Sequence, residues 1–321
     1  MLKDTLEIIL ITYNRKPFLQ NTFKQLLAET SPVKDLDITV LDNCSTDGTS
    51  DYLKELCSKH PNIKHIRHNR NIGGNANIAR AFETVSKPYF WILADDDNYD
   101  FSAWQQVEDA IKDNADLIVV NTEIIKGKMN YGKLIRILTF LPANIFKSTY
   151  ITPEILININ YNISTWFPHM AVICEVFNRN GKIKILDKNL VISGKENNNG
   201  IEYHRRTEAI NYRSKMQFFE VGYIKTLIML KDKKLRAQAA EYFAMDDSFF
   251  FKISDTFKKN LTEYDNNIAN YLEVLPSLSL WQKMRFFMAI ALNYIMYYIK
   301  YPYYRKKKKI FENRLKEYKK S

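Results

Sequence analysis

The sequence is poor in glycine, proline and cysteine, and each shortage narrows the kind of protein it can encode. Nine Gly and nine Pro among 321 residues leave little material for long low-complexity linkers. The three cysteines, Cys44, Cys57 and Cys174, are odd in number and far apart. They offer neither a disulfide framework nor a metal-ligand spacing, so we expect a reducing compartment.

The sequence also lacks a secretory leader and a long apolar run. Met1–Asp4 leads directly into a strand pattern, so we expect no signal peptide. The longest apolar run, residues 286–299, is interrupted by Asn293 and is short for a membrane span. With 46% hydrophobic residues, the chain can bury one large core, or a main domain and an appendage. We therefore expect a cytoplasmic protein.

Net positive charge is concentrated at one end of the chain. The formal net charge is +11, but residues 281–321 contain twelve Lys or Arg and two acids, so that this segment alone carries +10. The first 280 residues are nearly neutral and offer no broad basic face, which argues against nucleic-acid binding. Nearly all of the net positive charge therefore lies in the C-terminal tail, residues 281–321.

Apolar runs alternate with amphipathic segments through the first 121 residues. Near-continuous apolar runs such as residues 6–12 are typical of strands buried on both faces of a parallel sheet. The pattern predicts strands over 6–12, 37–41, 63–67, 89–94 and 116–121, with helices over 17–29, 49–59, 75–85 and 102–112. This alternation predicts an α/β fold with a mostly parallel open sheet flanked by helices.

Four polar clusters follow predicted strands: Thr12–Arg15, Asp42–Asp47, Asn69–Asn77 and Asp95–Asp97. Ligands of open α/β sheets bind beyond the carboxyl ends of the strands, so these clusters should form one site. Three consecutive carboxylates repel one another, and a divalent cation with oxygen ligands would offset that repulsion. The alternative is that the acids only form a turn and cap the next helix.

Two common phosphate-binding motifs are missing. The turn after the first strand, Thr12–Arg15, has no Gly-rich dinucleotide fingerprint, and no Gly-rich loop ends in Lys-Ser or Lys-Thr. A cation at Asp95–Asp97 would then hold a nucleotide diphosphate and assist its departure as a Lewis acid.

These motifs together resemble the family 2 glycosyltransferases of the GT-A fold, over about the first 120 residues. The Asn-Ile-Gly and Leu-Ala-Asp-Asp-Asp forms are similar to bacterial abequosyltransferase-like enzymes of surface polysaccharides. The resemblance rests on Ile9–Arg15, Val40–Thr49, Asn71–Gly73, Asn77, Arg80 and Trp91–Asp97.

The resemblance implies an inverting, metal-dependent transfer of a sugar from a nucleoside-diphosphate donor, with Mn²⁺ or Mg²⁺ as cofactor. It places Thr12, Asn14 and Arg15 beside the nucleotide and has Asp42 accept a hydrogen bond from the base, usually uracil. Asn43 stands where the family often has a second acid. The remaining donor-binding candidates are Asn71, Asn77, Arg80, Asp95 and Asp96, and the metal candidates are Asp97 and Asp95. Asn71 and Asn77 have the alternative role of satisfying loop backbone groups.

An inverting transfer needs a base that takes the proton of the acceptor hydroxyl. By spacing, His169 lies where the family has a catalytic acid at a helix start, and imidazole suits proton transfer near neutral pH. The alternative is a His that packs beside Trp166 and Phe167. Asp187 and Glu196 are the fallback bases, Glu196 within a Gly- and Asn-rich loop expected to close over the donor.

The C-terminal tail has apolar residues at helical spacing, followed by the basic run Arg305–Lys309. This combination predicts adhesion of residues 281–309 to an anionic membrane surface. A homodimer interface and a disordered basic tail are the alternatives. We divide the chain into a GT-A domain (1–210, with a nucleotide-sugar-binding half 1–121 and an acceptor half 122–210), a helical appendage (211–280) and a membrane-associating tail (281–321).

The sequence therefore predicts a bacterial glycosyltransferase at the inner face of the cytoplasmic membrane. Its donor would be a nucleotide sugar, in particular a UDP-sugar, and its acceptor a lipid-linked glycan or a growing lipopolysaccharide or capsule chain. A sugar nucleotidyltransferase is one alternative, although residues 13–18 lack its Gly-rich basic loop. A non-catalytic, membrane-bound nucleotide-sugar-binding scaffold is the other.

Overall fold

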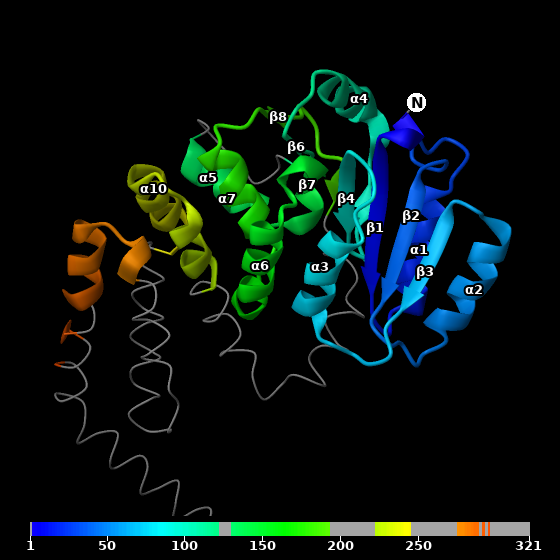
Figure 1. Ribbon diagram of the computed structural model, residues 1–321, viewed down its shortest axis with the longest axis horizontal. Helices are drawn as coiled ribbons and strands as arrows, with labels where there is room; N and C mark the ends of the chain where they lie inside the picture. Colours follow the sequence, from blue (N-terminus) through cyan, green and yellow to red (C-terminus); the bar gives the residue numbers. More distant parts are fainter. Residues whose placement is uncertain are drawn as a thin grey trace, which may run out of the picture.

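The computed structural model shows a seven-stranded sheet covered by helices on both faces (Figure 1). It describes residues 2–121, 130–192, 222–244, 275–288, 291, 292 and 295. The strand order is β3-β2-β1-β4-β7-β6-β8, and β5 pairs with β9 in a separate small sheet. The strands are β1 (Leu6–Thr12), β2 (Asp37–Asp42), β3 (Ile63–Arg67), β4 (Tyr89–Leu93), β5 (Asn98–Tyr99), β6 (Leu117–Val119), β7 (Asn144–Lys147), β8 (Ile183–Ile185) and β9 (Val191–Ile192).

The sheet is mostly parallel, and β1 lies between β2 and β4. β1 pairs in parallel with both neighbours, and β2 pairs in parallel with β3. Only β7 runs against its neighbours β4 and β6. The carboxyl ends of β3, β2, β1 and β4 therefore lie side by side at one edge, as the sequence predicts.

Helices pack on both faces because side chains along each strand alternate in direction. In β1, Ile8 and Leu10 join the buried cluster formed with α1 and α4, whereas Ile9 joins the one formed with α3, α5, α6 and α7. The helices are α1 (Lys16–Leu26), α2 (Thr49–Lys59), α3 (Gly74–Glu83), α4 (Trp104–Lys112), α5 (Tyr131–Leu138), α6 (Pro153–Tyr161), α7 (Met170–Asn178) and α10 (Lys233–Ala244). The short 3₁₀ turns are η1 (Leu2–Asp4), η2 (Phe101–Ala103), η3 (Leu141–Ala143), η4 (Ser148–Tyr150), η5 (Asn162–Thr165), η6 (Leu227–Met229) and η7 (Leu275–Ser277).

The predicted elements of the first 121 residues are all present, with shifted ends. α1 ends at Leu26 rather than near residue 29, and a 3₁₀ turn opens the segment predicted as a helix from 102. The two-residue strands β5 and β9 and the edge strand β8 were not predicted, because runs of two or three residues carry no periodic signal.

The C-terminal part consists of helices beside α5 and α7. α10 packs on α5, and a further helix containing residues 280–288 lies at the far side of α10 (Figure 1). None of the described helices is long and apolar enough to cross a bilayer. Glu196, the Gly194–Gly200 loop and the basic run Arg305–Lys309 lie outside the described residues.

Candidate active site

The acid triplet begins where β4 ends, and its first member is bound to β1. The parallel register pairs Leu10 with Leu93, which brings the residues after both strands together. Thr12 Oγ1 donates a 2.6 Å hydrogen bond to Asp95 Oδ2, although the two residues are 83 positions apart. The sheet topology therefore brings together two of the predicted site residues.

Arg15 joins the first two acids of the triplet. One guanidinium nitrogen lies 2.8 Å from Asp95 Oδ1 and another lies 2.7 Å from Asp96 Oδ2. Asp95 is 2% exposed, and burial raises its pKa to about 6, although Arg15 and the Thr12 hydroxyl act in the opposite direction. Burial disfavours the charge of Arg15, but the two carboxylates outweigh it and raise the pKa of the guanidinium.

Two polar side chains of α1 hold the backbone of the triplet. The buried Thr22 hydroxyl donates to the Asp95 carbonyl at 2.9 Å. Gln25 Nε2 donates to the Asp97 carbonyl at 3.3 Å, and its Oε1 accepts from the Tyr99 amide at 3.0 Å. Neither residue was predicted. The sequence did contain a signal for them, because two polar residues stand three positions apart on an otherwise apolar face of α1. That spacing places both side chains toward the sheet.

The loops after β1 and β2 are bound to each other through Asn14. This residue has a left-handed backbone (φ 51°), which Asn tolerates better than most residues. Its amide donates to Ser45 Oγ at 2.9 Å, and its side-chain oxygen accepts from the Thr46 amide at 2.7 Å. The Lys16 amide donates to Asp47 Oδ2 at 3.0 Å, and Asp47 Oδ1 accepts from Thr49. Asp47 thus closes the turn that leads into α2.

Asp42 is completely buried beneath its own loop. Its carboxylate accepts from the Ser45 amide at 2.8 Å and from the Ser50 hydroxyl, with His65 Nε2 3.5 Å away. Burial acts to raise the pKa of Asp42, but the nearby His65 ring and the hydrogen bonds from Ser45 and Ser50 outweigh it, so that the net pKa is lowered. In this conformation Asp42 shapes the loop on which a base would lie.

The loop after β3 is bound to the loop after β2 by side-chain amides. Asn43 Nδ2 donates to Asn71 Oδ1 at 2.9 Å, and Asn43 Oδ1 accepts from the Ile72 amide at 2.9 Å. Gly73 follows with φ 87°, a conformation open mainly to glycine, and α3 begins at the next residue. Asn43, the departure from the family pattern, therefore connects two of the strand-end loops.

Asn77 and Arg80 lie on α3 in different surroundings. Asn77 is buried, where its Oδ1 lies 2.8 Å from His68 Nε2 and its Nδ2 donates to the Leu41 carbonyl at 3.2 Å. Arg80 is exposed and lines a cavity of about 330 Å³ beside Arg67 and Arg70. Asn77 thus supports the end of β2, and Arg80 is available to a ligand.

Comparison with known sequences identifies the family. Residues 7–180 match the sequence profile described as Glycosyl transferase family 2, which is more than half of the chain. The chain belongs to glycosyl transferase family 2. It is therefore a glycosyltransferase, as the strand-end motifs predicted.

Two proteins with assigned names are similar in sequence to this family 2 chain. It is 27% identical over 132 residues to a dolichol-phosphate mannosyltransferase of Pyrococcus furiosus, and 30% identical over 88 residues to abequosyltransferase RfbV of Salmonella typhimurium. These regions cover 40% and 27% of this chain, but only 37% and 26% of the relatives. The chain thus aligns with less than two fifths of either relative.

Solved structures show the same fold. Crystal structures of S. aureus TarS residues 1–349, in complex with UDP and with UDP-GlcNAc, match with TM-scores of 0.58 and 0.54 at 14% identity. The first match covers 85% of this chain and 81% of TarS, and the second covers 78% and 80%. The GT-A fold expected for this family 2 enzyme is confirmed.

The acid triplet suits a divalent cation that shares its coordination with a substrate. Asp95 already uses one oxygen for Thr12 and the other for Arg15, whereas Asp97 is buried two residues later. Within the described ranges, no three His, Cys, Asp or Glu side chains are close enough to enclose a metal. Mg²⁺-type sites commonly use one or two carboxylates together with substrate phosphates and water. The oxygen donors present fit such a cation.

His169 and Asp187, the two base candidates within the described residues, contact other parts of the protein. His169 is 2% exposed, its Nε2 lies 3.1 Å from the Leu138 carbonyl, and burial lowers its pKa to about 4. Its ring meets Phe167 edge to face, which favours the packing alternative. Asp187 is exposed after β8, and its backbone amide donates a 3.1 Å hydrogen bond to Gln106 Oε1. Glu196 lies outside the described residues.

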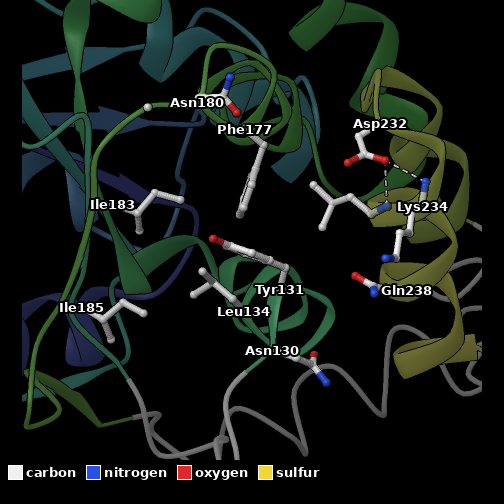
Figure 2. A pocket seen from close by; sticks show the side chains of 12 residues that line it. Asn130, Tyr131, Leu134, Phe177, Asn180, Ile183, Ile185, Asp232, Lys234 and Gln238 are labelled. Atoms are coloured by element: carbon white, nitrogen blue, oxygen red, sulfur yellow. Dashed lines mark hydrogen bonds between the residues drawn. The ribbon is translucent and has the colours of Figure 1, made fainter.

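A large cavity lies apart from the predicted site. It has a volume of about 890 Å³ and lies between α5, α7, β8 and α10 (Figure 2). Tyr131 and Phe177 meet edge to face inside it, with ring centroids 6.1 Å apart. None of the predicted donor-binding or metal-binding residues lines it.

Proposed function

We propose that this enzyme transfers a sugar from a nucleoside diphosphate, in particular UDP, to a hydroxyl of a glycan acceptor with inversion at the anomeric carbon. One observation carries the proposal: Arg15 bridges Asp95 and Asp96 where β1 and β4 end, beside the loops after β2 and β3. The complexes of the similar TarS fold with UDP and UDP-GlcNAc support uridine as the base.

The predicted donor residues divide into two roles under this proposal. Asp42, Asn77 and Thr12 are buried and shape the loops on which the nucleotide lies. Asn71, Arg80 and the partly exposed Asp96 can touch the donor itself. Asn14 and Arg15 do both, because each holds a loop and lies at its surface.

In the transfer, the acceptor hydroxyl oxygen forms a bond to the anomeric carbon while the bond from that carbon to the diphosphate breaks. A divalent cation held by Asp97, with Asp95 beside it, would supply positive charge for the departing diphosphate. Arg15 keeps Asp95 and Asp96 at fixed positions against their mutual repulsion. The acceptor proton goes to a base. His169, Asp187 and Glu196 stay the predicted candidates, and of these His169 is buried, with 2% of its surface exposed.

The acceptor proposed is a lipid-linked glycan or a growing surface polysaccharide, reached from the inner face of the cytoplasmic membrane. The similarity to an abequosyltransferase and the basic tail support this place of action. We also propose that the chain is divided into a GT-A domain (1–210), a helical appendage (211–280) and a membrane-associating tail (281–321).

The test combines ligand binding and turnover in two matched variants. Asp97→Asn should remove the Mn²⁺-dependent rise in melting temperature that UDP produces, and should lower UDP release from a UDP-sugar at least about a hundredfold. Asp100→Asn, three positions away, keeps the cap at Ser102 and should behave as the wild type. Undiminished turnover of Asp97→Asn, or of the wild type in excess chelator, would contradict the metal role. Absence of any donor hydrolysis across a panel of sugar nucleotides would instead favour the non-catalytic scaffold.

A further inference from the structure

Large exposed apolar side chains concentrate on the helix at the C-terminal end of the described chain. Seven of them are between 49% and 76% exposed, and all lie between residues 280 and 295. Scattered exposed hydrophobic residues are normal, but a contiguous set marks an interaction surface. We name this set the outer face: Leu280, Trp281, Met284, Phe287, Met288, Leu292 and Ile295.

At helical spacing, the seven residues of the outer face fall on one side. With 3.6 residues per turn, each residue advances by about 100°, and the seven positions fall within an arc of about 140°. Gln282 and Phe286 fall on the opposite side, and both are buried (3% and 0% exposed). The helix thus has one apolar side that faces away from the protein. Its opposite side packs against the protein.

The buried side fixes the helix to the body of the enzyme. Ser279 and Gln282 form a reciprocal cap, in which Gln282 Oε1 accepts from the Ser279 amide at 2.8 Å and Ser279 Oγ accepts from the Gln282 amide at 3.3 Å. Gln282 Nε2 also donates to the Ala237 carbonyl of α10 at 2.9 Å. Phe286 belongs to the same buried cluster as Tyr223 and Leu227. These contacts keep the outer face outward.

Positive charge borders the outer face on both sides. By the same helical geometry, Lys283 and Arg285 fall beyond its two edges. In the sequence, residues 281–321 carry a net +10, and the basic run Arg305–Lys309 begins ten residues after Ile295. An apolar stripe with aromatic residues and basic borders is the pattern of helices that lie in the headgroup region of a bilayer.

We propose that the outer face inserts into the interfacial region of an anionic lipid bilayer and orients the enzyme on it. The charge decides between the two possible occupants. Two copies of this chain that met through this face would bring two strongly basic segments together, whereas anionic headgroups complement them. The inference rests on the proposed function only for the location of the acceptor, because bilayer binding needs neither donor nor turnover.

The test measures binding of the full chain to vesicles that contain phosphatidylglycerol and phosphatidylcholine, against vesicles of phosphatidylcholine alone. We expect binding to the anionic vesicles at 0.1 M salt and weaker binding at 0.5 M, because salt screens the headgroup charge. Trp281→Glu with Met284→Glu should lower the vesicle partition coefficient about tenfold or more. The matched control, Ile157→Glu, alters an equally exposed apolar residue on α6 (55% exposed) and should bind as the wild type.

The outcomes separate the membrane proposal from the catalytic one. Asp97→Asn should bind vesicles as tightly as the wild type, since the acid triplet has no part in lipid contact. Circular dichroism should show that the double variant is folded. The proposal is overturned if the folded double variant binds vesicles like the wild type, or if the full chain ignores anionic vesicles. A dimer in light scattering that the double variant dissociates, without vesicle binding, would assign the face to a second copy.

Discussion

The strand-end region and the C-terminal helices are stabilised by different kinds of interaction. At the strand ends, polar side chains join segments about eighty residues apart, as Thr12 and Arg15 do with Asp95 and Asp96. The C-terminal helices instead join through apolar side chains, such as Tyr223 and Phe286, with Gln282 as a polar contact to α10.

This difference matches what each region has to do. A network of hydrogen bonds and ion pairs is directional, so it can hold loops and carboxylates in one geometry for a ligand. Apolar packing is less directional, but it can hold a helix while leaving its other side free to meet a partner. The first region should therefore fail when a polar partner is removed, and the second when apolar volume is removed.

The largest expected effect comes from apolar volume in the second region. Phe286→Ala empties a site that is completely buried, and such truncations cost about 3–5 kcal/mol in the free energy of unfolding. We expect the helix to detach, with rapid trypsin cleavage at Lys283 and Arg285. Phe287→Ala, its half-exposed neighbour, should change the stability by less than about 1 kcal/mol. Equal protease resistance of both variants would show that the helix is not held by Phe286.

The second prediction removes a polar partner in the first region. Arg15→Met keeps most of the apolar stem but leaves the buried Asp95 carboxylate without its ion pair, so we expect a loss of about 2–4 kcal/mol. The estimate is below that for a fully buried pair because Arg15 is partly exposed. Urea unfolding at pH 7 measures it, with the exposed Arg70→Met as control. Identical unfolding midpoints of the two variants would show that the bridge contributes nothing to stability.

Much of the strand-end fold was predictable because local pattern and global topology agree there. Apolar runs such as residues 6–12 determine the strands, and the rule for parallel sheets then places their polar ends together. Nothing in the sequence specified that β7 runs antiparallel between β4 and β6, because strand direction depends on connections rather than on periodicity. The pairing of β5 with β9 was unpredictable for the same reason.

The site was predictable as a set of residues but not as a set of contacts. The sequence indicated Asp42 and Asn77, yet both are buried and hydrogen-bonded within the protein. Burial of a polar side chain depends on which loop covers it, and that information is not local. Thr22 and Gln25 escaped prediction because their partners are backbone carbonyls and amides, which every residue has.

The smallest expected effect on stability comes from removing the charge of Asp42 in the strand-end region. Asp42→Asn keeps the shape and one acceptor oxygen but removes the charge that His65 and the two serines stabilise. We expect a loss of about 1–2 kcal/mol in unfolding free energy at pH 7. Asp51→Asn, which alters an exposed acid in the first turn of α2, should change the stability by less than about 0.5 kcal/mol. Urea unfolding of both variants, at several pH values, measures the difference.

The direction of the pH dependence follows from the lowered pKa of Asp42. A carboxyl whose folded pKa lies below its unfolded value contributes stability above the unfolded value, about 4, and loses that contribution as the pH falls toward the folded value. The wild type should therefore lose its advantage over Asp42→Asn as the pH falls from 5 toward 3, and the two curves should approach each other. A difference that stays constant from pH 7 to pH 3 would assign the effect to hydrogen-bond geometry alone. No such convergence is expected for Phe286→Ala, because a cavity left by an apolar side chain carries no proton.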